Sequence, residues 1–281
     1  MQENEKAPAK INLCLNVVGK REDGYHDMEM VMTPIDLADR LSFSLEDEGI
    51  SIDSNSSSMP LNEKNIVYKT AQLVKNTYNV KSGVSIYVEK VIPIAAGLGG
   101  GSADAAATLR ALNRLWGLDR SLEELADLGE KIGADVPFCV YGQTAFVTGK
   151  GENVKPIAPF PPCWVIVVKP PKGISSWTVF KDLKVKDLPY YPIEKMVHSI
   201  NNGEYKESVA CAGNALEGQA KKQNPSIEVI KNKMLTFGAD TALMSGTGPT
   251  VFGLTKSYSK AKRMMNGLKG FCKEVYLIRN L

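Results

Sequence analysis

Glycine residues clustered in one short stretch are the clearest candidates for chemistry in this chain. Residues 93–104 read PIAAGLGGGSAD, and four of five successive positions are glycine: Gly97, Gly99, Gly100 and Gly101. Glycine allows several backbone N–H groups to point toward one place, and a following helix adds partial positive charge at its N-terminus. Such a loop can bind phosphate. For this stretch alone, a turn of small residues that permits tight helix packing is an equally good interpretation.

The same stretch does not match two common phosphate-binding motifs. A Walker A loop needs Gly-Lys-Ser/Thr, which does not follow here, and a dinucleotide-binding fingerprint needs a third glycine where Ser102 stands. The loop therefore points to phosphate binding of another kind.

Three further features carry polar groups in places that suit catalysis or binding. Residues 243–250 (LMSGTGPT) form a second glycine-rich turn between two expected strands, and Lys10 and Asn12 lie on the same face of the first expected strand. Asp135 stands between the end of an expected helix and Pro137. Each feature has an ordinary alternative, which is a hairpin turn, a solvated lysine or a turn-capping aspartate.

Taken together, these segments resemble a known family. Residues 8–13 (PAKINL), 93–103 and 245–249 (SGTGP) match, in order and spacing, the three motifs of the GHMP kinases. Residues 21–26 (REDGYH) and 133–138 (GADVPF) resemble those members that phosphorylate a cytidine-diphosphate-linked methylerythritol in non-mevalonate isoprenoid precursor biosynthesis. The resemblance runs over essentially the whole chain, which makes it far more specific than a single glycine loop.

The resemblance implies a reaction and a set of residue roles. The γ-phosphoryl group of ATP, which arrives as its Mg²⁺ complex, would pass to the 2-hydroxyl of CDP-methylerythritol and give the 2-phosphate and ADP. Lys10 and Asp135 would be catalytic, with Asp135 accepting the hydroxyl proton. The ATP-binding residues would be Asn65, Pro93, Gly97, Leu98, Gly99, Gly100, Gly101, Ser102 and Ala103. The substrate-binding residues would be Asn12, Tyr25, His26, Phe180, Gly246 and Thr247.

Several of these roles have competing interpretations. Trp177 competes with Phe180 for stacking on the cytosine, and Asn65 is equally readable as a helix cap. Ala103 stands where many relatives carry a second serine, so this position can offer phosphate only its backbone. No metal ligand is assigned, because no Asp/Glu pair is clearly dedicated to Mg²⁺, and Asp104 is as readily a first-turn helix residue.

Two other functions stay open from the sequence. The chain could be another GHMP kinase acting on mevalonate or homoserine, although a small aliphatic substrate offers nothing for Tyr25 in the Asp-Gly-Tyr-His turn to stack upon. It could also be a nucleotide-binding relative without catalytic activity. Lys10, Asp135 and all three loops are present, which argues against the second alternative.

Hydrophobic periodicity and turn signals predict the elements that must position these residues. Strands are expected over residues 11–17, 28–33, 41–45, 50–52, 84–88, 144–148, 164–169, 241–245, 251–255 and 274–279. Helices are expected over residues 65–78, 103–116, 121–133, 224–238 and 260–268, with a mostly helical stretch after residue 169.

Strands and helices mixed in this order indicate an α+β protein. The resemblance implies a two-domain GHMP kinase fold. Residues 1–158 would form an N-terminal α/β domain with the glycine-rich phosphate loop, and residues 159–281 a ferredoxin-like C-terminal domain. The proline cluster over residues 156–162 is the expected joint.

Composition narrows the class of protein further. Among 281 residues, 34 Lys and Arg face 31 Asp and Glu, and a net charge of +3 gives no basic footprint for nucleic acid. Only two histidines are present, which excludes a His-rich metal site, and five scattered cysteines suit a reducing compartment. No apolar run approaches the ~20 residues of a membrane helix. We expect a cytoplasmic protein without membrane or nucleic-acid partners, either a monomer or a homodimer.

Overall fold

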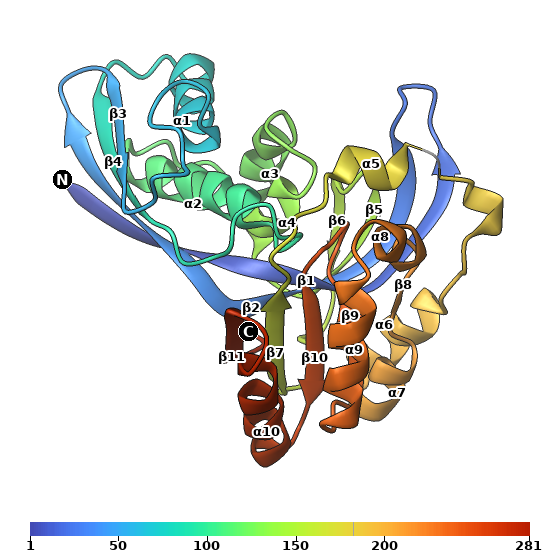
Figure 1. Cartoon of the computed structure of the whole chain (residues 1–281). Helices are drawn as coiled ribbons and strands as arrows, with labels where there is room; N and C mark the ends of the chain where they lie inside the picture. The colour runs from blue at the N-terminus through green and yellow to red at the C-terminus, as the bar shows by residue number, and fades with distance from the viewer. Residues whose placement is uncertain (182) are drawn as a thin grey trace. The chain divides into compact units, whose positions relative to one another are not determined.

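The computed structural model describes residues 1–181 and 183–281, and within them the chain forms two compact units. Unit 1 contains residues 1–9, 37–94 and 99–142, and unit 2 contains residues 10–36, 95–98 and 143–281. Two long strands, β1 (Gln2–Lys20) and β2 (His26–Glu46), pass from one unit into the other (Figure 1). Neither unit is therefore a single continuous stretch of sequence.

Unit 1 combines a small sheet with four helices. The second half of β2 pairs antiparallel with β4 (Gly83–Glu89), and β3 (Ile50–Ser54) pairs parallel with β4. The helices are α1 (Ile66–Thr77), α2 (Gly100–Leu115), α3 (Leu122–Glu130) and α4 (Val136–Tyr141), and α2 packs against the other three. Every residue of α2 from Ala103 to Leu109 is buried, so this helix is the centre of the unit.

Local sequence signals account for two helix starts in unit 1. The Asn65 side chain accepts the N–H of Val67 and caps α1. Ser121 and Glu124 form the expected capping box at the start of α3, with both reciprocal hydrogen bonds present.

Unit 2 contains a four-stranded antiparallel sheet. Its strands are β7 (Trp164–Lys169), β9 (Thr241–Met244), β10 (Val251–Thr255) and β11 (Glu274–Arg279), in the spatial order β11-β7-β10-β9. Helices α9 (Ser226–Thr236) and α10 (Tyr258–Lys269) pack on it, as Figure 1 shows. With α9 before β9 and α10 before β11, the order is that of a β-α-β-β-α-β ferredoxin-like fold. The expected ferredoxin-like arrangement is confirmed.

The remaining elements of unit 2 lie along β1 and β2 or in the helical stretch. The first half of β2 pairs with β5 (Ala145–Gly149), which pairs with β6 (Asn153–Pro156), and β8 (Gly213–Asn214) runs parallel to β1. The helical stretch contains α5 (Ser176–Phe180), a 3₁₀ turn (Val185–Asp187), α6 (Ile193–Asn201), α7 (Tyr205–Ala210) and α8 (Glu217–Gln223).

Three predictions of the elements were wrong in their bounds or number. The separate strands expected over residues 28–33 and 41–45 are one continuous strand, β2 (His26–Glu46). Helix α3 ends at Glu130, before Gly133. Helix α4 was not expected, because its six residues give too short a periodic pattern to recognise.

No helix among the described residues has the length and apolar character that crossing a membrane requires. The domain boundary expected between residues 158 and 159 stays a prediction. Each compact unit consists of three separate stretches of the sequence, so no single position divides the two units.

Candidate active site

The glycine-rich loop leads directly into helix α2 of unit 1, which begins earlier than expected. It starts at Gly100 and not near Ala103, and its first helical hydrogen bond runs from Ala103 N–H to Gly99 O at 2.8 Å. The N–H groups of the residues at the start of the helix therefore have no partner within it. The amides of Gly100, Gly101 and Ser102 thus lie at the positive end of a long helix, an arrangement that can bind phosphate.

Backbone conformation explains why this loop needs glycine. Gly97 and Gly99 have φ values of 73° and 70°, in the left-handed region that favours glycine, and Ala95 is held there as well at 53°. A side chain at Gly97 would also collide with the third motif, because a Cβ there would lie 2.5 Å from Ser245 O. The loop is thus shaped both by conformation and by close packing.

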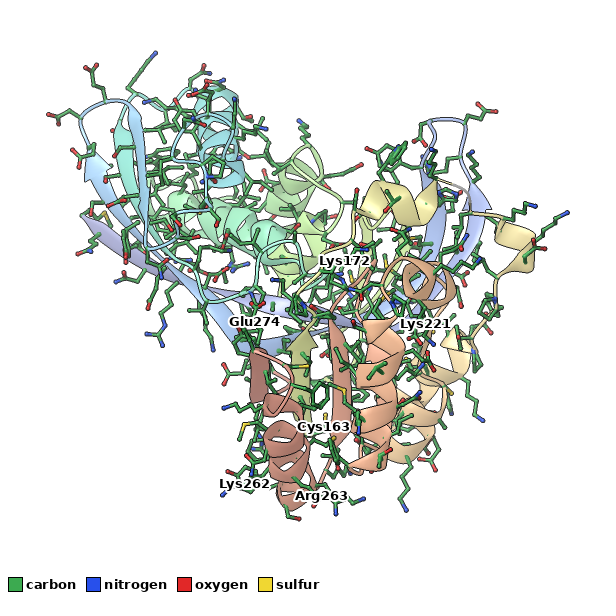
Figure 2. All side chains as sticks on the ribbon, in the orientation of Figure 1. Cys163, Lys172, Lys221, Lys262, Arg263 and Glu274 are labelled. Atoms are coloured by element: carbon green, nitrogen blue, oxygen red, sulfur yellow. The ribbon has the colours of Figure 1, made fainter. Side chains whose placement is uncertain are left out.

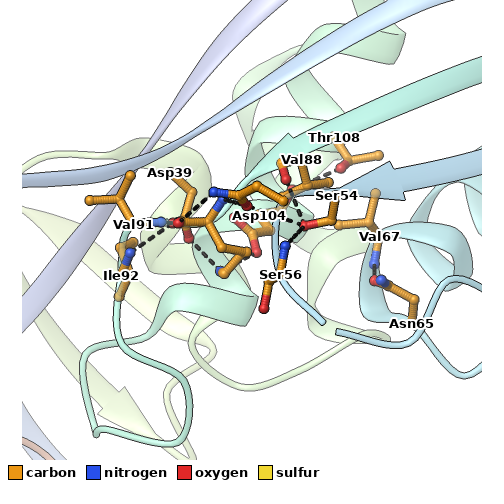
Figure 3. A network of polar contacts seen from close by, with 12 residues as sticks. Asp39, Ser54, Ser56, Asn65, Val67, Val88, Val91, Ile92, Asp104 and Thr108 are labelled. Atoms are coloured by element: carbon orange, nitrogen blue, oxygen red, sulfur yellow. Dashed lines mark hydrogen bonds and ion pairs between the residues drawn. The ribbon is translucent and has the colours of Figure 1, made fainter. Parts of the chain in front are cut away.

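A buried cluster of three ionisable side chains in unit 1 supports the part of the loop that enters α2. The Lys90 ammonium donates to Asp104 at 2.7 Å and also to Asp39, and all three side chains are almost fully buried (Figure 3). Asp39 Oδ1 additionally accepts the N–H groups of Val91 and Ile92 at 2.5 and 2.8 Å. The cluster therefore ties the segment entering the loop to helix α2, which leaves it.

Asp104 carries an unusual charge state in this cluster. Burial is the main cause that raises the pKa of its carboxyl to about 8; the negative charge of Asp39 adds to the rise, while the Lys90 ammonium opposes it. Its Oδ1 is also buried without a hydrogen-bond partner. Lys90 and Asp39 were not predicted from the sequence to belong to the site. The only signals were that Lys90 shortly precedes the glycine loop and that Asp39 lies on a long strand, β2.

Asn65 is buried and acts as a helix cap in unit 1. Its Oδ1 accepts Val67 N–H at 2.8 Å, and its Nδ2 donates to Pro60 O at 2.5 Å (Figure 3 shows the bond to Val67). The capping interpretation is confirmed, and contact with adenine stays a prediction.

Asp135 occupies the residue before helix α4 in unit 1. It is the N-cap position of that helix, but its side chain makes no capping hydrogen bond. The capping role that is ordinary for an aspartate in such a loop is therefore not what its carboxylate does here.

In unit 2, Lys10 and Asn12 form a buried pair on strand β1. Lys10 exposes only 4% of its surface, contrary to the usual behaviour of a strand lysine, and its Nζ donates to Asn12 Oδ1 at 2.8 Å. The backbone N–H of Lys10 donates to Leu98 O at 2.9 Å. Lysine is seldom buried unless it is paired. Lys10 is therefore a fixed interior group bonded to Asn12, and the alternative of a solvated surface lysine is wrong.

The glycine-rich turn over residues 243–250, which contains the third motif and is called the third glycine turn below, lies directly against this pair in unit 2. A Cβ added at Gly246 would lie 3.5 Å from both Lys10 Nζ and Asn12 Oδ1. Ser245 Oγ also donates to Gly97 O at 2.9 Å. Segments from all three sequence motifs therefore come together in one unit, which the sequence could suggest only by resemblance.

His26 and Phe180 form a stacked aromatic pair in unit 2. Their ring centroids are 5.1 Å apart and the rings are inclined by 23°. His26 exposes 7% of its surface, and its Nε2 is buried with no hydrogen-bond partner among the described residues. Burial, with a smaller effect of the Lys20 charge, lowers the pKa of His26 below its usual value, so the ring is neutral at pH 7. A neutral ring nitrogen is thus left to bond to a ligand.

Two other aromatic residues near this pair point toward solvent. Tyr25 is 61% exposed, with Lys150 Nζ 5.7 Å from its ring centroid. Trp177 is 65% exposed, with Lys181 Nζ 4.9 Å from its ring centroid. The geometry favours Phe180 over Trp177 as the ring nearest to His26.

The expected site residues divide between the two units. Unit 1 holds Asn65, Pro93, Gly99, Gly100, Gly101, Ser102, Ala103 and Asp135, and unit 2 holds Lys10, Asn12, Tyr25, His26, Gly97, Leu98, Phe180, Gly246 and Thr247. Within unit 2 the structure brings together the Lys10/Asn12 pair, the end of the glycine loop and the third glycine turn. The approach of Asp135 to Lys10 stays a prediction.

Comparisons with known proteins agree with this arrangement. The sequence profile described as "GHMP kinases N terminal domain" matches residues 65–143, and the one described as "GHMP kinases C terminal" matches residues 196–274. A 4-diphosphocytidyl-2-C-methyl-D-erythritol kinase of Listeria innocua is 50% identical, over 97% of this chain and 94% of its own length. The Bacillus subtilis protein of the same name is 51% identical over 98% of this chain and 96% of its own length.

The solved structures include a similar protein. A crystal structure of 4-(cytidine 5'-diphospho)-2C-methyl-D-erythritol kinase has a TM-score of 0.84 and 33% sequence identity, and the match covers 99% of both chains.

Proposed function

Since the chain belongs to the GHMP kinases and is about half identical to 4-diphosphocytidyl-2-C-methyl-D-erythritol kinases over nearly its full length, we propose that it catalyses their reaction. It transfers the γ-phosphoryl group of ATP to the 2-hydroxyl of 4-(cytidine 5'-diphospho)-2-C-methyl-D-erythritol, in non-mevalonate isoprenoid precursor biosynthesis. The products are the 2-phosphate and ADP. The observation that carries the chemistry is the buried Lys10/Asn12 pair packed against the third glycine turn.

Phosphoryl transfer requires mainly positioning and stabilisation of negative charge. The substrate oxygen forms a bond to the γ-phosphorus as the bond from that phosphorus to the β,γ-bridging oxygen breaks, and ADP leaves. Asp135 accepts the proton of the hydroxyl, which is general-base help typically worth about 10²–10⁴-fold. The Lys10 ammonium lies beside the transferred group and offsets its charge.

The triphosphate rests on the amides at the start of α2. Among the described residues, no group of three or more His, Cys, Asp or Glu side chains could hold a metal ion. Mg²⁺ typically binds one or two carboxylates together with the substrate phosphates, and we propose that it enters as part of the MgATP substrate.

The cytosine is recognised by the aromatic pair of unit 2. His26 Nε2, which has no protein partner, bonds to the edge of the base, and Phe180 supplies a stacking face. Because the two rings already touch, the base either lies on an outer face or separates them. Tyr25 is free enough at the surface to close over the other face of the base. Stacking on each aromatic face is worth about 1–3 kcal/mol.

The remaining expectations belong to the same proposal. The protein acts in the cytoplasm on a small molecule, as a monomer or a homodimer, with no nucleic-acid partner. Residues 1–158 and 159–281 form its N-terminal and C-terminal domains.

A substrate comparison tests the proposed function. Purified protein is supplied with MgATP and one of three acceptors, which are the CDP-linked methylerythritol, mevalonate or homoserine, and ADP release is measured. We expect kcat/KM for the CDP-linked alcohol to exceed that for the other two by at least about 10³-fold. Stacking on the aromatic pair and the hydrogen bond to His26 Nε2 contribute binding energy only when the acceptor carries a cytosine. Equal or greater turnover of mevalonate or homoserine would refute the proposal.

A further inference from the structure

Asn214 is a buried residue that neither the motifs nor the proposed mechanism uses. It exposes 1% of its surface, and its side chain makes three hydrogen bonds, all to backbone groups. Its Nδ2 donates to Met244 O at 2.9 Å and to Gly246 O at 2.8 Å, and its Oδ1 accepts Leu216 N–H at 2.9 Å. One side chain therefore holds two carbonyls at the start of the third glycine turn.

The same residue is connected to the strand that carries Lys10 and Asn12. Strand β8 runs parallel to β1, and Asn214 is opposite Leu15 in the register. Ala215 N–H donates to Leu15 O at 2.9 Å, which continues this connection. Asn214 thus fixes the glycine turn relative to β1.

Peptide geometry gives this contact a chemical consequence. In a trans peptide the C=O and the following N–H point in opposite directions, and among the described residues the only cis bond is Gly248–Pro249. When Gly246 O is turned toward Asn214, the N–H of Thr247 is turned away from it.

That N–H is available to a ligand. Ser245 N–H donates to Thr250 O and Gly248 N–H donates to Ser245 O, both at 2.9 Å. In the part of the chain that the structure describes, Thr247 N–H donates to no protein acceptor, and Thr247 is only half-buried. Backbone donors of this kind are most effective when they are fixed before the ligand arrives.

A second buried side chain holds the other side of the turn. Glu217 Oε2 accepts Met244 N–H at 3.1 Å, while its Oε1 is paired with Lys221 at 2.8 Å and Lys231 at 2.5 Å. Figure 2 labels Lys221 on helix α8. The turn is therefore held from β8 and α8 together, and Asn214 is the member that contacts the glycine itself.

We propose that Asn214 is a positioning residue for the acceptor substrate, which orients Thr247 N–H beside the Lys10/Asn12 pair so that it donates to an anionic oxygen of that substrate. The inference rests on the proposed function, because it assumes that the acceptor carries a diphosphate. It assigns a role to a residue that contacts no substrate atom and acts only through the backbone of the turn.

Two substitutions at this position test the inference. Asn214→Asp keeps the shape and the acceptor for Leu216 N–H but replaces both donors with a carboxylate that faces two carbonyls, and Asn214→Ala removes the side chain altogether. Each substitution leaves the buried carbonyls of Met244 and Gly246 without a donor, which is costly enough for the Gly246–Thr247 peptide to rotate and move Thr247 N–H away from the substrate. We therefore expect each to raise KM for the CDP-linked alcohol at least about tenfold. The Kd for MgATP, measured by calorimetry, should stay within about twofold of the wild-type value.

Asn280 provides a matched control. It also bonds two backbone groups, donating to Phe160 O and accepting Cys163 N–H, both at 2.8 Å. It lies at the Trp164 end of β7, whereas the glycine turn joins β10 at Val251, opposite Val168. Figure 2 labels Cys163 just before β7. Asn280→Ala should lower the melting temperature and leave KM for the alcohol within about twofold.

The outcomes separate the inference from the proposed function. A folded Asn214→Asp protein with the wild-type KM for the alcohol would overturn the inference, as would an equal rise of KM in Asn280→Ala or an equal rise of Kd for MgATP. If Asn214→Ala does not fold, Asn214→Asp alone decides. If the wild-type protein itself neither binds nor phosphorylates the CDP-linked alcohol, the proposed function fails and the inference falls with it.

Discussion

Burial decides what individual polar residues of this protein can do. Lys10, Asn12 and His26 are each less than 8% exposed, although all three belong to types usually found at the surface or at its edge. Lys10 finds a partner in Asn12, while His26 Nε2 has none. A buried polar atom without a partner is costly, which is why we propose that His26 Nε2 bonds to the base of the substrate.

Asp135 gives the first prediction at this scale. Asp135→Asn keeps the size of the side chain and removes its basicity, so we expect kcat in an ADP-release assay to fall at least about 10²-fold with little change in KM for ATP. Asp127→Asn is the control, because Asp127 is an exposed carboxylate on the neighbouring helix α3. Near-normal turnover of Asp135→Asn would remove this residue from the role of base.

Asp104 gives a prediction about stability and pH. Its pKa is raised to about 8 in the folded protein from an ordinary value of 3.8. The folded state thus holds this proton more tightly, so the contribution of Asp104 to stability is largest at low pH, is lost as the pH rises toward 8, and is constant above that. The slope within this window is at most about 1.4 kcal/mol per pH unit.

Denaturant unfolding of Asp104→Asn at pH 5.5, 7, 8 and 9 measures this effect. An amide does not titrate, so we expect the stability of Asp104→Asn relative to wild type to increase from pH 5.5 to 8 and then to level off. Asp47→Asn, which changes an exposed carboxylate of the same unit, should show no such trend. A pH-independent difference for Asp104→Asn would contradict the raised pKa.

At the scale of elements, the N-terminus of helix α2 forms part of the candidate site. Helix α2 begins at Gly100, so the glycine loop is also the first turn of the helix, and its amides gain from the helix dipole. The cluster of Lys90, Asp39 and Asp104 connects β2, the end of β4 and α2. These elements therefore position residues 99–101 of the loop within unit 1.

Helix α1 yields a prediction because its cap and the proposed adenine contact involve the same residue. Asn65→Ser retains a good N-cap but loses the hydrogen bond from Nδ2 to Pro60 O, so the free energy of unfolding should fall by about 1 kcal/mol. The serine is too short to reach a base, and KM for ATP should rise at least about fivefold. Ser121→Ala, which removes the cap of α3, should lower stability by about 1 kcal/mol without affecting KM for ATP. An unchanged KM in Asn65→Ser would leave Asn65 as a cap only.

At the scale of the whole molecule, the chain passes repeatedly between its two units. The glycine loop itself is shared, because residues 95–98 belong to unit 2 and residues 99–101 to unit 1. Charge is nearly balanced, at +3 over 281 residues. Affinity for the polyanionic substrates must therefore come from placed amides and a few placed cations, and not from an overall positive field.

Metal removal gives the prediction at this scale. Excess EDTA should abolish phosphoryl transfer, because MgATP is withdrawn, and added Mg²⁺ should restore it fully. The melting temperature of the protein without nucleotide should not change on EDTA addition, since the described residues form no cluster that could hold a metal ion. A fall of the melting temperature with EDTA would reveal a resident structural metal.

The sequence by itself determined those features that depend on neighbours along the chain. The capping box of α3, the cap of α1 and strands β7, β10 and β11 could all be predicted, because turn residues and periodicity act over a few positions. The ferredoxin-like fold was expected from the resemblance to the GHMP kinases, with which the predicted order of elements agreed. The glycine loops were recognised from composition, and their function from resemblance. The short helix α4 and the continuity of β2 were missed, since neither leaves a clear local pattern.

Only the tertiary structure decided which distant residues meet. His26 stacks on Phe180, Asn214 holds Gly246, and Lys90 pairs with Asp39 across 51 positions of sequence. It also decided that Lys10 is buried and that the pKa of Asp104 is raised. Solvent exclusion and charge proximity are properties of the packed interior, and a linear pattern specifies neither until strands and helices far apart in the chain have come into contact.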